Sequence, residues 1–88
     1  MYWSTFTSGP GGVSTREVGT IRGDLEIQVD DTGDVMVRYA GALDEYTVAG
    51  GPVDVGTPVD AVIAWLERDL GTDDYDNPIP ATLDDTPF

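Results

Sequence analysis

The stretch DLEIQVDDTGDVMVRY, residues 24–39, decides the fold. Apolar residues occupy every second position of its first part (24–30) and of its last part (35–39), where Met36 and Arg38 face the other way, and this is the period of two expected for strands with one buried face. Residues 31–34, DTGD, have the polar side chains and glycine of a short hairpin turn. The stretch therefore predicts an antiparallel hairpin, whose inward residues are Leu25, Ile27, Val29, Val35, Val37 and Tyr39.

Further strands extend this hairpin. Residues 45–49 alternate in phase with it, and residues 2–7 alternate near the N-terminus. Residues 14–22 predict a weaker strand, in which Gly19 can mark a bulge. We expect the polar face of the resulting meander to be mostly acidic, with Arg38 neutralised by its cross-strand neighbours.

One amphipathic helix follows the strands. Thr57 is the expected N-cap, Pro58 the first helical residue and Asp60 a favourable charge in the first turn. Gly71 is the expected C-terminal cap, so the helix should have about three and a half turns. Trp65 is expected at the margin of the core. The apolar stripe comprises Val59, Val62, Ile63, Leu66 and Leu70.

The sequence thus predicts an α+β protein with one domain, residues 1–71. In it an antiparallel β-meander of about four to five strands packs on one C-terminal helix, because a half-buried sheet and an amphipathic helix each need a partner. Residues 72–88 contain five acidic residues, three prolines and no basic residue. They show no strand or helix period, so we expect an extended acidic tail outside the core.

Composition excludes most catalytic chemistry. The 88 residues contain no cysteine, histidine or lysine, so the chain lacks the thiolate, imidazole and amine groups that most often bind zinc, titrate near neutrality or act as nucleophiles. Residues 9–12 (GPGG) lack the lysine of a phosphate-binding loop, and residues 30–34 lack the ligand spacing of a calcium loop. Residues 73–77 (DDYDN) are better explained as a solvated acidic run than as a cation site. We expect a protein that is not an enzyme and has no metal and no cofactor.

Charge is the strongest compositional feature. The net charge is −13; residues 24–88 hold sixteen acidic residues and two arginines, whereas residues 1–23 hold one glutamate and two arginines. Such a surface repels nucleic acids and membranes and attracts basic surfaces. We therefore expect a basic protein as partner, no direct binding to nucleic acid or membrane, and room for a homodimer.

The start of the chain has no basic segment followed by an apolar run, and nowhere do eighteen apolar residues follow one another. We expect a cytoplasmic protein, in the host cytoplasm if it is viral.

Carboxylates along strands can form a row that resembles the phosphates of a nucleic acid, and a basic DNA-binding cleft accepts such a row. In size and charge the chain is similar to the DNA-mimic inhibitors found especially in phages. The hypothesis is an inhibitor or modulator of a DNA-processing or nucleic-acid-binding protein. Its expected contacts on the sheet are Asp24, Glu26, Asp30, Asp34 and Glu45.

The last residues, LDDTPF, suggest a second contact. They resemble the C-terminal tip of bacterial single-stranded DNA-binding proteins, where an acidic run precedes an apolar residue, proline and a terminal phenylalanine. Thr86 stands where that family carries an aliphatic residue. The resemblance implies docking on DNA-repair and replication enzymes, with phenylalanine in an apolar pocket and its carboxylate on an arginine. The matching residues are Asp84, Asp85, Pro87 and Phe88.

Two alternatives stay open. Many aspartates with no lysine are also typical of a small domain from a salt-adapted organism, where the acids hydrate the surface. A small single-stranded DNA-binding protein would use aromatic and basic residues of the N-terminal part, although the net charge and the helix position argue against it. Those residues are Tyr2, Trp3, Phe6, Arg16 and Arg22.

Overall fold

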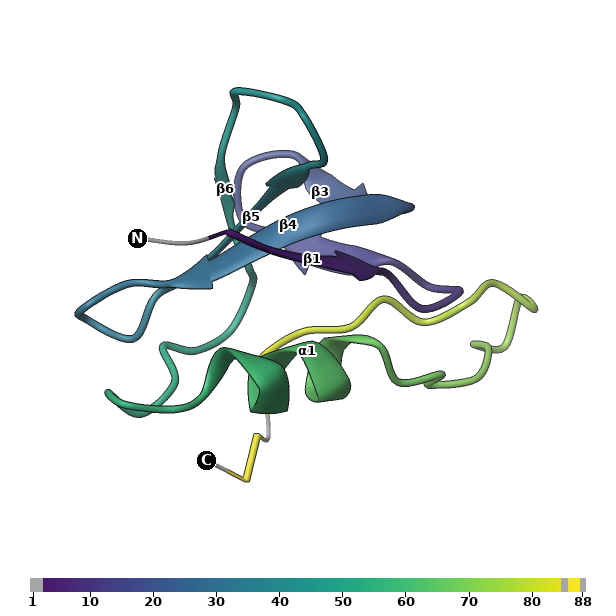
Figure 1. Ribbon diagram of the computed structural model, residues 1–88. Coiled ribbons are helices and arrows are strands. Elements are labelled where there is room, and N and C mark those ends of the chain that lie inside the picture. Colours follow the sequence, from purple (N-terminus) through teal and green to yellow (C-terminus); the bar gives the residue numbers. More distant parts are fainter. Residues whose placement is uncertain (1–2, 85, 88) are drawn as a thin grey trace.

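Six strands and one short helix form the part of the chain that the computed structural model describes, residues 3–84, 86 and 87 (Figure 1). The strands are β1 (Ser4–Thr7), β2 (Val13–Thr15), β3 (Gly19–Ile21), β4 (Asp24–Val29), β5 (Val35–Tyr39) and β6 (Tyr46–Thr47), and the helix is α1 (Val59–Leu66). Four strands form an antiparallel sheet in the order β1-β4-β5-β6, and β2 and β3 form a second sheet. The predicted α+β class agrees with this architecture.

The central hairpin is the one that the alternating pattern predicts. In it β4 pairs with β5 so that Ile27 lies opposite Val37. The turn between the strands is closed by Asp30, whose side chain accepts a hydrogen bond from the Asp34 N–H at 3.0 Å. Gly33 supplies the left-handed backbone, at φ 88°, that this turn requires. Tyr39, at the end of β5, is 43% exposed although its position faces inward.

Residues 14–22 form a hairpin where the sequence predicted one strand. The chain reverses between β2 and β3, and Thr15 closes the reversal: its hydroxyl donates to the Gly19 carbonyl at 2.6 Å and accepts from the Val18 N–H at 3.2 Å. The free edge of β2 then pairs with the end of β6, where the Ala49 N–H donates to the Ser14 carbonyl at 2.8 Å. The two sheets are thereby joined around one core.

The helix is shorter than predicted at both ends. The Thr57 hydroxyl donates to the Asp54 carbonyl, so the N-cap is Pro58 without a side-chain bond. After Leu66 the Arg68 side chain folds back, and its Nε donates to the Trp65 carbonyl at 2.9 Å. This bond satisfies a carbonyl that another helical turn would use. Gly71 therefore does not cap the helix, contrary to the prediction.

The core lies between the inner sheet face, α1 and the second sheet. Thr15 is a buried polar residue at its margin, with its hydroxyl bonded as described. Trp65 is partly buried beside the core, as predicted. The buried apolar residues are Phe6, Val13, Ile21, Leu25, Ile27, Val35, Val37, Val48, Val53, Val62, Leu66, Ala81 and Leu83.

The end of the chain departs from the predicted tail. Ala81 and Leu83 are each 2% exposed and belong to the core. The Ala81 N–H donates to the Gly12 carbonyl, and the Ala81 carbonyl accepts from the Ser14 N–H, both at 2.9 Å. The expectation that residues 72–88 lie outside the core is therefore wrong at these two residues: Ala81 pairs along β2, and Leu83 bonds to Ala49.

Close backbone approach makes this packing possible. The Leu83 N–H donates to the Ala49 carbonyl at 2.9 Å. The next residue, Gly50, has φ 82°, and a Cβ there would lie 2.8 Å from the Asp84 nitrogen. The Trp65 indole N–H donates to the Thr82 carbonyl at 2.9 Å, which ties the segment to α1. In Figure 1 this segment, drawn in yellow, runs alongside the helix.

Candidate functional site

The outer face of the four-stranded sheet is less acidic than predicted. Register places Thr5 opposite Glu26 and Thr7 opposite Asp24, all on this face. On the other side of β4, Gln28 lies opposite Met36. The strand pairing thus places two carboxylates, Asp24 and Glu26, beside hydroxyl, amide and thioether side chains. Both carboxylates accept hydrogen bonds within the protein. The Asp24 carboxylate accepts the Thr7 hydroxyl at 2.9 Å.

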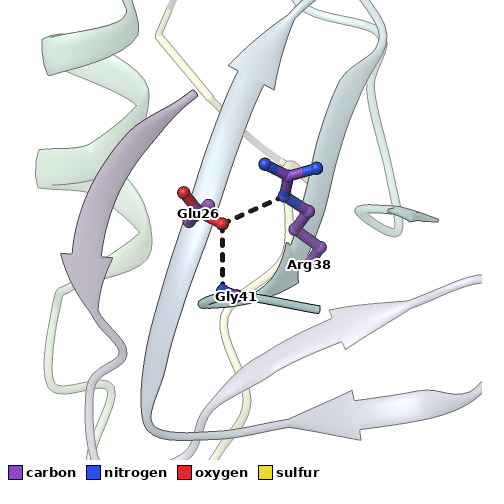
Figure 2. A network of polar contacts seen from close by, with 3 residues as sticks. All are labelled: Glu26, Arg38 and Gly41. Carbon is purple, nitrogen blue, oxygen red and sulfur yellow. Dashed lines mark hydrogen bonds and ion pairs between the residues drawn. The ribbon is translucent and has the colours of Figure 1, made fainter. Parts of the chain in front are cut away.

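Glu26 is the most constrained of the predicted contact residues (Figure 2). Its Oε1 accepts the Arg38 Nε at 3.0 Å and the Gly41 N–H at 3.3 Å. The two side chains are 18% and 22% exposed. The Arg38 guanidinium also stacks over the Trp3 ring, 4.1 Å from its centroid. The predicted neutralisation of Arg38 by a cross-strand neighbour is confirmed, and Glu26 carries no free charge toward a partner.

Asp30 and Asp34 lie at the β4–β5 turn, beyond the end of the strands. The Asp30 Oδ1 accepts the Thr32 hydroxyl at 2.6 Å and the Thr32 N–H at 2.8 Å. These bonds, led by the one from the hydroxyl, lower the pKa of Asp30 below its ordinary 3.8. Asp30 therefore stabilises the turn in its ionised form.

The remaining predicted contacts are dispersed. Glu45 is exposed in the loop before β6. Asp84 is exposed and accepts the Thr82 hydroxyl at 3.2 Å, and Pro87 is exposed. Asp85 and Phe88 lie outside the described residues. The described members of the predicted set thus occupy the sheet face, a turn, a loop and the C-terminal segment, so no single face gathers them.

A different group of acids lies in one continuous stretch of the chain. Residues 54–76, which we call the acidic segment, include α1 and its flanking chain below the sheet in Figure 1. All seven of its acidic side chains are exposed, and none forms an ion pair with a described residue. Its one basic residue, Arg68, stacks on Trp65 at 3.4 Å from the ring centroid. The acids are Asp54, Asp60, Glu67, Asp69, Asp73, Asp74 and Asp76.

None of these seven residues belongs to the predicted set. The sequence indicated Asp73, Asp74 and Asp76 only as part of a solvated acidic run, and the other four acids are separated along the chain, with only Asp60 inside α1. The observable pattern was the ratio of seven acids to one arginine between residues 54 and 76. That ratio, rather than strand alternation, would have found them.

Glu17 is a further acid with a structural role. Its Oε1 accepts the Thr47 N–H at 2.8 Å and its Oε2 accepts the Thr47 hydroxyl at 2.9 Å. The bond from the Thr47 main chain is the largest cause that lowers the pKa of Glu17 below its ordinary 4.5. Glu17 thereby fastens the β2–β3 turn to β6.

Two of the surface hollows formed by described residues were compared with the predicted contacts, and neither of them is lined by two carboxylates. The first has a volume of about 460 Å³ and one carboxylate. The second, of about 510 Å³, lies between α1 and the C-terminal segment, and both Arg68 and Asp84 line it. The first is lined by Thr5, Phe6, Thr7, Asp24, Leu25 and Ala40, and the second by Trp65, Arg68, Leu70, Ile79, Pro80, Thr82 and Asp84.

Other kinds of site were sought in the part of the chain that the structure describes. There, no three acidic, histidine or cysteine side chains gather as metal ligands. In the same residues no helix is long and apolar enough to cross a membrane. Of the N-terminal aromatics, Phe6 is 7% exposed and Trp3 is stacked by Arg38, whereas Tyr2 lies outside the described residues.

Comparisons with known proteins give no precedent for this chain. No protein-family model, curated protein or solved structure matches it.

Proposed function

We propose that this protein is a non-enzymatic acidic binding protein that inhibits or modulates a DNA-processing or other nucleic-acid-binding protein, as encoded by a phage or another mobile element. The observation that supports the proposal is the acidic segment, with seven exposed carboxylates that no described cation neutralises. A basic cleft attracts such a surface through the same sequence-independent electrostatics with which it holds phosphates.

The charge density of the acidic segment is of the right order for this role. Seven acids and Arg68 give six net negative charges, and the longest dimension of the molecule is 39 Å. The spacing is therefore at most about 6.5 Å per net charge, against about 3.4 Å for one strand of DNA. The segment has at least half the charge density of a single strand, so it competes for a basic cleft without copying a duplex.

The C-terminal tip supplies a second contact in this proposal. Thr86 is half-buried and Pro87 is exposed, and the segment before them is anchored in the core through Leu83. A partner would then meet a tip whose preceding segment is already fixed, which limits the entropy lost on binding.

The test is affinity capture from a host lysate with three forms of the full-length chain. One form neutralises the acidic segment by Asp60→Asn, Glu67→Gln and Asp74→Asn. A matched form removes the same charge elsewhere. Its substitutions are Asp31→Asn, Asp44→Asn and Glu45→Gln, all at exposed positions.

We expect wild type and the matched form to recover a nucleic-acid enzyme and the first form to lose it. Recovery of no nucleic-acid enzyme by wild type would sink the proposal. Equal loss in both neutralised forms would mean that total charge, and not the acidic segment, governs binding. A fourth form that lacks Pro87 and Phe88 tests the tip: undiminished capture removes the tip from the proposal.

The same exposed carboxylates also suit a salt-adapted domain, in which they hydrate the surface. Unfolding by urea at low and at molar potassium chloride separates the two functions. A domain that folds fully at low ionic strength does not depend on salt for its stability. One that folds only in concentrated salt supports the salt-adapted alternative.

A further inference from the structure

Strand β1 is the outermost strand of the four-stranded sheet, and no described strand pairs with its other edge (Figure 1). Register sets Phe6 opposite Leu25, and beyond the strand the Ser8 N–H donates to the Gly23 carbonyl at 2.9 Å. Hydrogen-bonded pairs alternate along an antiparallel ladder. Residues 4, 6 and 8 therefore direct their main-chain groups to β4, whereas Thr5 and Thr7 direct theirs to the open edge.

This edge also lies in the longest stretch of the sequence without charged side chains. Residues 3–15 contain no acidic and no basic side chain, in a chain with twenty-one charged residues. The edge strand has no lysine, proline or inward charge of the kind that usually prevents edge-to-edge pairing. Thr5 and Thr7 are exposed, and threonine is favourable in strands.

We propose that β1 is a self-association edge, on which a second copy of this chain pairs its own β1 in antiparallel fashion. Thr5 lies opposite Thr7 of the second copy and Thr7 opposite Thr5 of the second copy, because this register uses both outward-facing residues. The arrangement is isologous, with the two-fold axis between the facing Phe6 positions. The two four-stranded sheets become one continuous antiparallel sheet.

Charge selects a second copy over a charged partner strand. Two copies, each with a net charge of −13, repel wherever their carboxylates face each other. At the β1 edge the two strands can meet without carboxylates directly opposite one another. The nearest acid, Asp24, is bonded to Thr7. In the proposed register its row continues to Glu26 of the second copy, three strand spacings or about 14 Å away. That distance exceeds the Debye length of about 8 Å at physiological salt.

The edge offers few hydrogen bonds, so the dimer should be weak, with a dissociation constant of the order of 100 μM. Sedimentation velocity of the full chain, from tenfold below to tenfold above that value, tests the proposal at two salt concentrations. We expect dimerisation to strengthen with salt, because the copies have like charge. Binding of the basic partner proposed above weakens with salt, so the two proposals fail independently.

Two variants with equal added charge locate the interface. Thr5→Asp/Thr7→Asp places carboxylates directly opposite one another and should weaken the dimer at least about tenfold. Leu43→Asp/Val55→Asp adds the same charge at side chains that are 90% and 74% exposed, away from the edge. This second variant should dimerise like wild type. Far-UV circular dichroism checks that both variants fold.

Amide hydrogen exchange distinguishes a self-association edge from a strand with only a structural role, because only self-association makes the protection of β1 amides depend on protein concentration. The Thr5 and Thr7 amides should become protected as protein concentration rises, while the Phe6 amide is protected throughout by β4. A chain that stays monomeric at every concentration and salt overturns the proposal. So does a dimer in which the Thr5 and Thr7 amides exchange freely, or one that both variants weaken equally.

Discussion

Replacing Leu83 by alanine tests whether the end of the chain is part of the core. Leu83 is 2% exposed and contacts the core cluster, while its main chain bonds to Ala49. The sequence gives little reason to expect this, since the residue lies in an acidic run between prolines. Leu83→Ala should therefore destabilise the whole domain, whereas a residue in a solvated tail would tolerate it.

The expected cost follows from burial. Replacing a buried leucine by alanine costs about 2–5 kcal/mol, and the lower half applies where the surroundings can relax. The segment is held from one side by β2 and lies near the chain end, so we expect about 2–3 kcal/mol. An 88-residue domain has a free energy of unfolding of about 4–13 kcal/mol. The variant should lose a substantial part of it, and its Tm should fall by about 10–20 °C.

Urea denaturation followed by tryptophan fluorescence measures the change, because Trp65 bonds to Thr82 in the same segment. Ile79→Ala is the matched control: Ile79 precedes the buried part of the segment and is 38% exposed. It should cost about 1 kcal/mol or less. If Leu83→Ala costs no more than Ile79→Ala, the packing described for the C-terminal segment is wrong.

Three further substitutions test other contacts. Gly11→Ala should destabilise the domain by about 1–3 kcal/mol in thermal unfolding, since a Cβ there overlaps the Ile79 carbonyl; an unchanged Tm would contradict that approach. Glu17→Gln should be less stable than wild type at pH 7, and the difference in free energy of unfolding should shrink as pH falls through the lowered pKa of Glu17. A carboxylate with a lowered pKa stabilises the fold above its unfolded pKa and loses this contribution as pH falls through the folded one. A difference that persists in acid would exclude the charge as its cause. Arg38→Ala should cost about 1–2 kcal/mol in urea denaturation, through loss of the ion pair and of the Trp3 stack, whereas an effect near zero would show that both contacts are open in solution.

The central hairpin could be predicted because its determinants are local. Residues 24–39 combine a strict period of two with turn residues that suit only a few geometries, and a one-residue slip would expose the whole apolar set. The reversal within residues 14–22 lacks such a pattern. It depends on the Thr15 hydroxyl, which bonds across the turn to Gly19. A single side-chain hydrogen bond of this kind produces no periodic pattern in the sequence.

The C-terminal packing and the helix end could not be predicted for a different reason. Ala81 bonds to Gly12, and Leu83 bonds to Ala49, so the partners are more than thirty residues away along the chain. Two apolar residues in a proline-containing run do not indicate such distant pairing. The apolar stripe of the helix continues to Leu70, but the bond from the Arg68 side chain to a carbonyl ends the helix earlier.

The distinction between local determinants and contacts with distant residues also applies to the acidic residues. Net charge is additive and could be predicted from composition, but whether a carboxylate is free depends on its neighbours in space. Glu26 was a predicted contact because it alternates outward on a strand, and that position is also what brings it within 3.0 Å of Arg38. Alternation therefore identified the acids that the sheet uses internally. Those of the acidic segment form no ion pair with a described residue, and Arg68, the segment's one cation, stacks on Trp65.

Salt has opposite effects on the two proposed interactions, so their combination has a defined salt dependence. Salt screens the repulsion between two copies at the β1 edge, and it also screens the attraction between the acidic segment and a basic cleft. A dimer carries two acidic segments. A partner with repeated basic surfaces can bind both segments at once and gain avidity, but only while the dimer and the electrostatic contacts both persist. Binding by wild type then passes through a maximum with salt, whereas the Thr5→Asp/Thr7→Asp variant, which cannot pair, weakens steadily as salt rises.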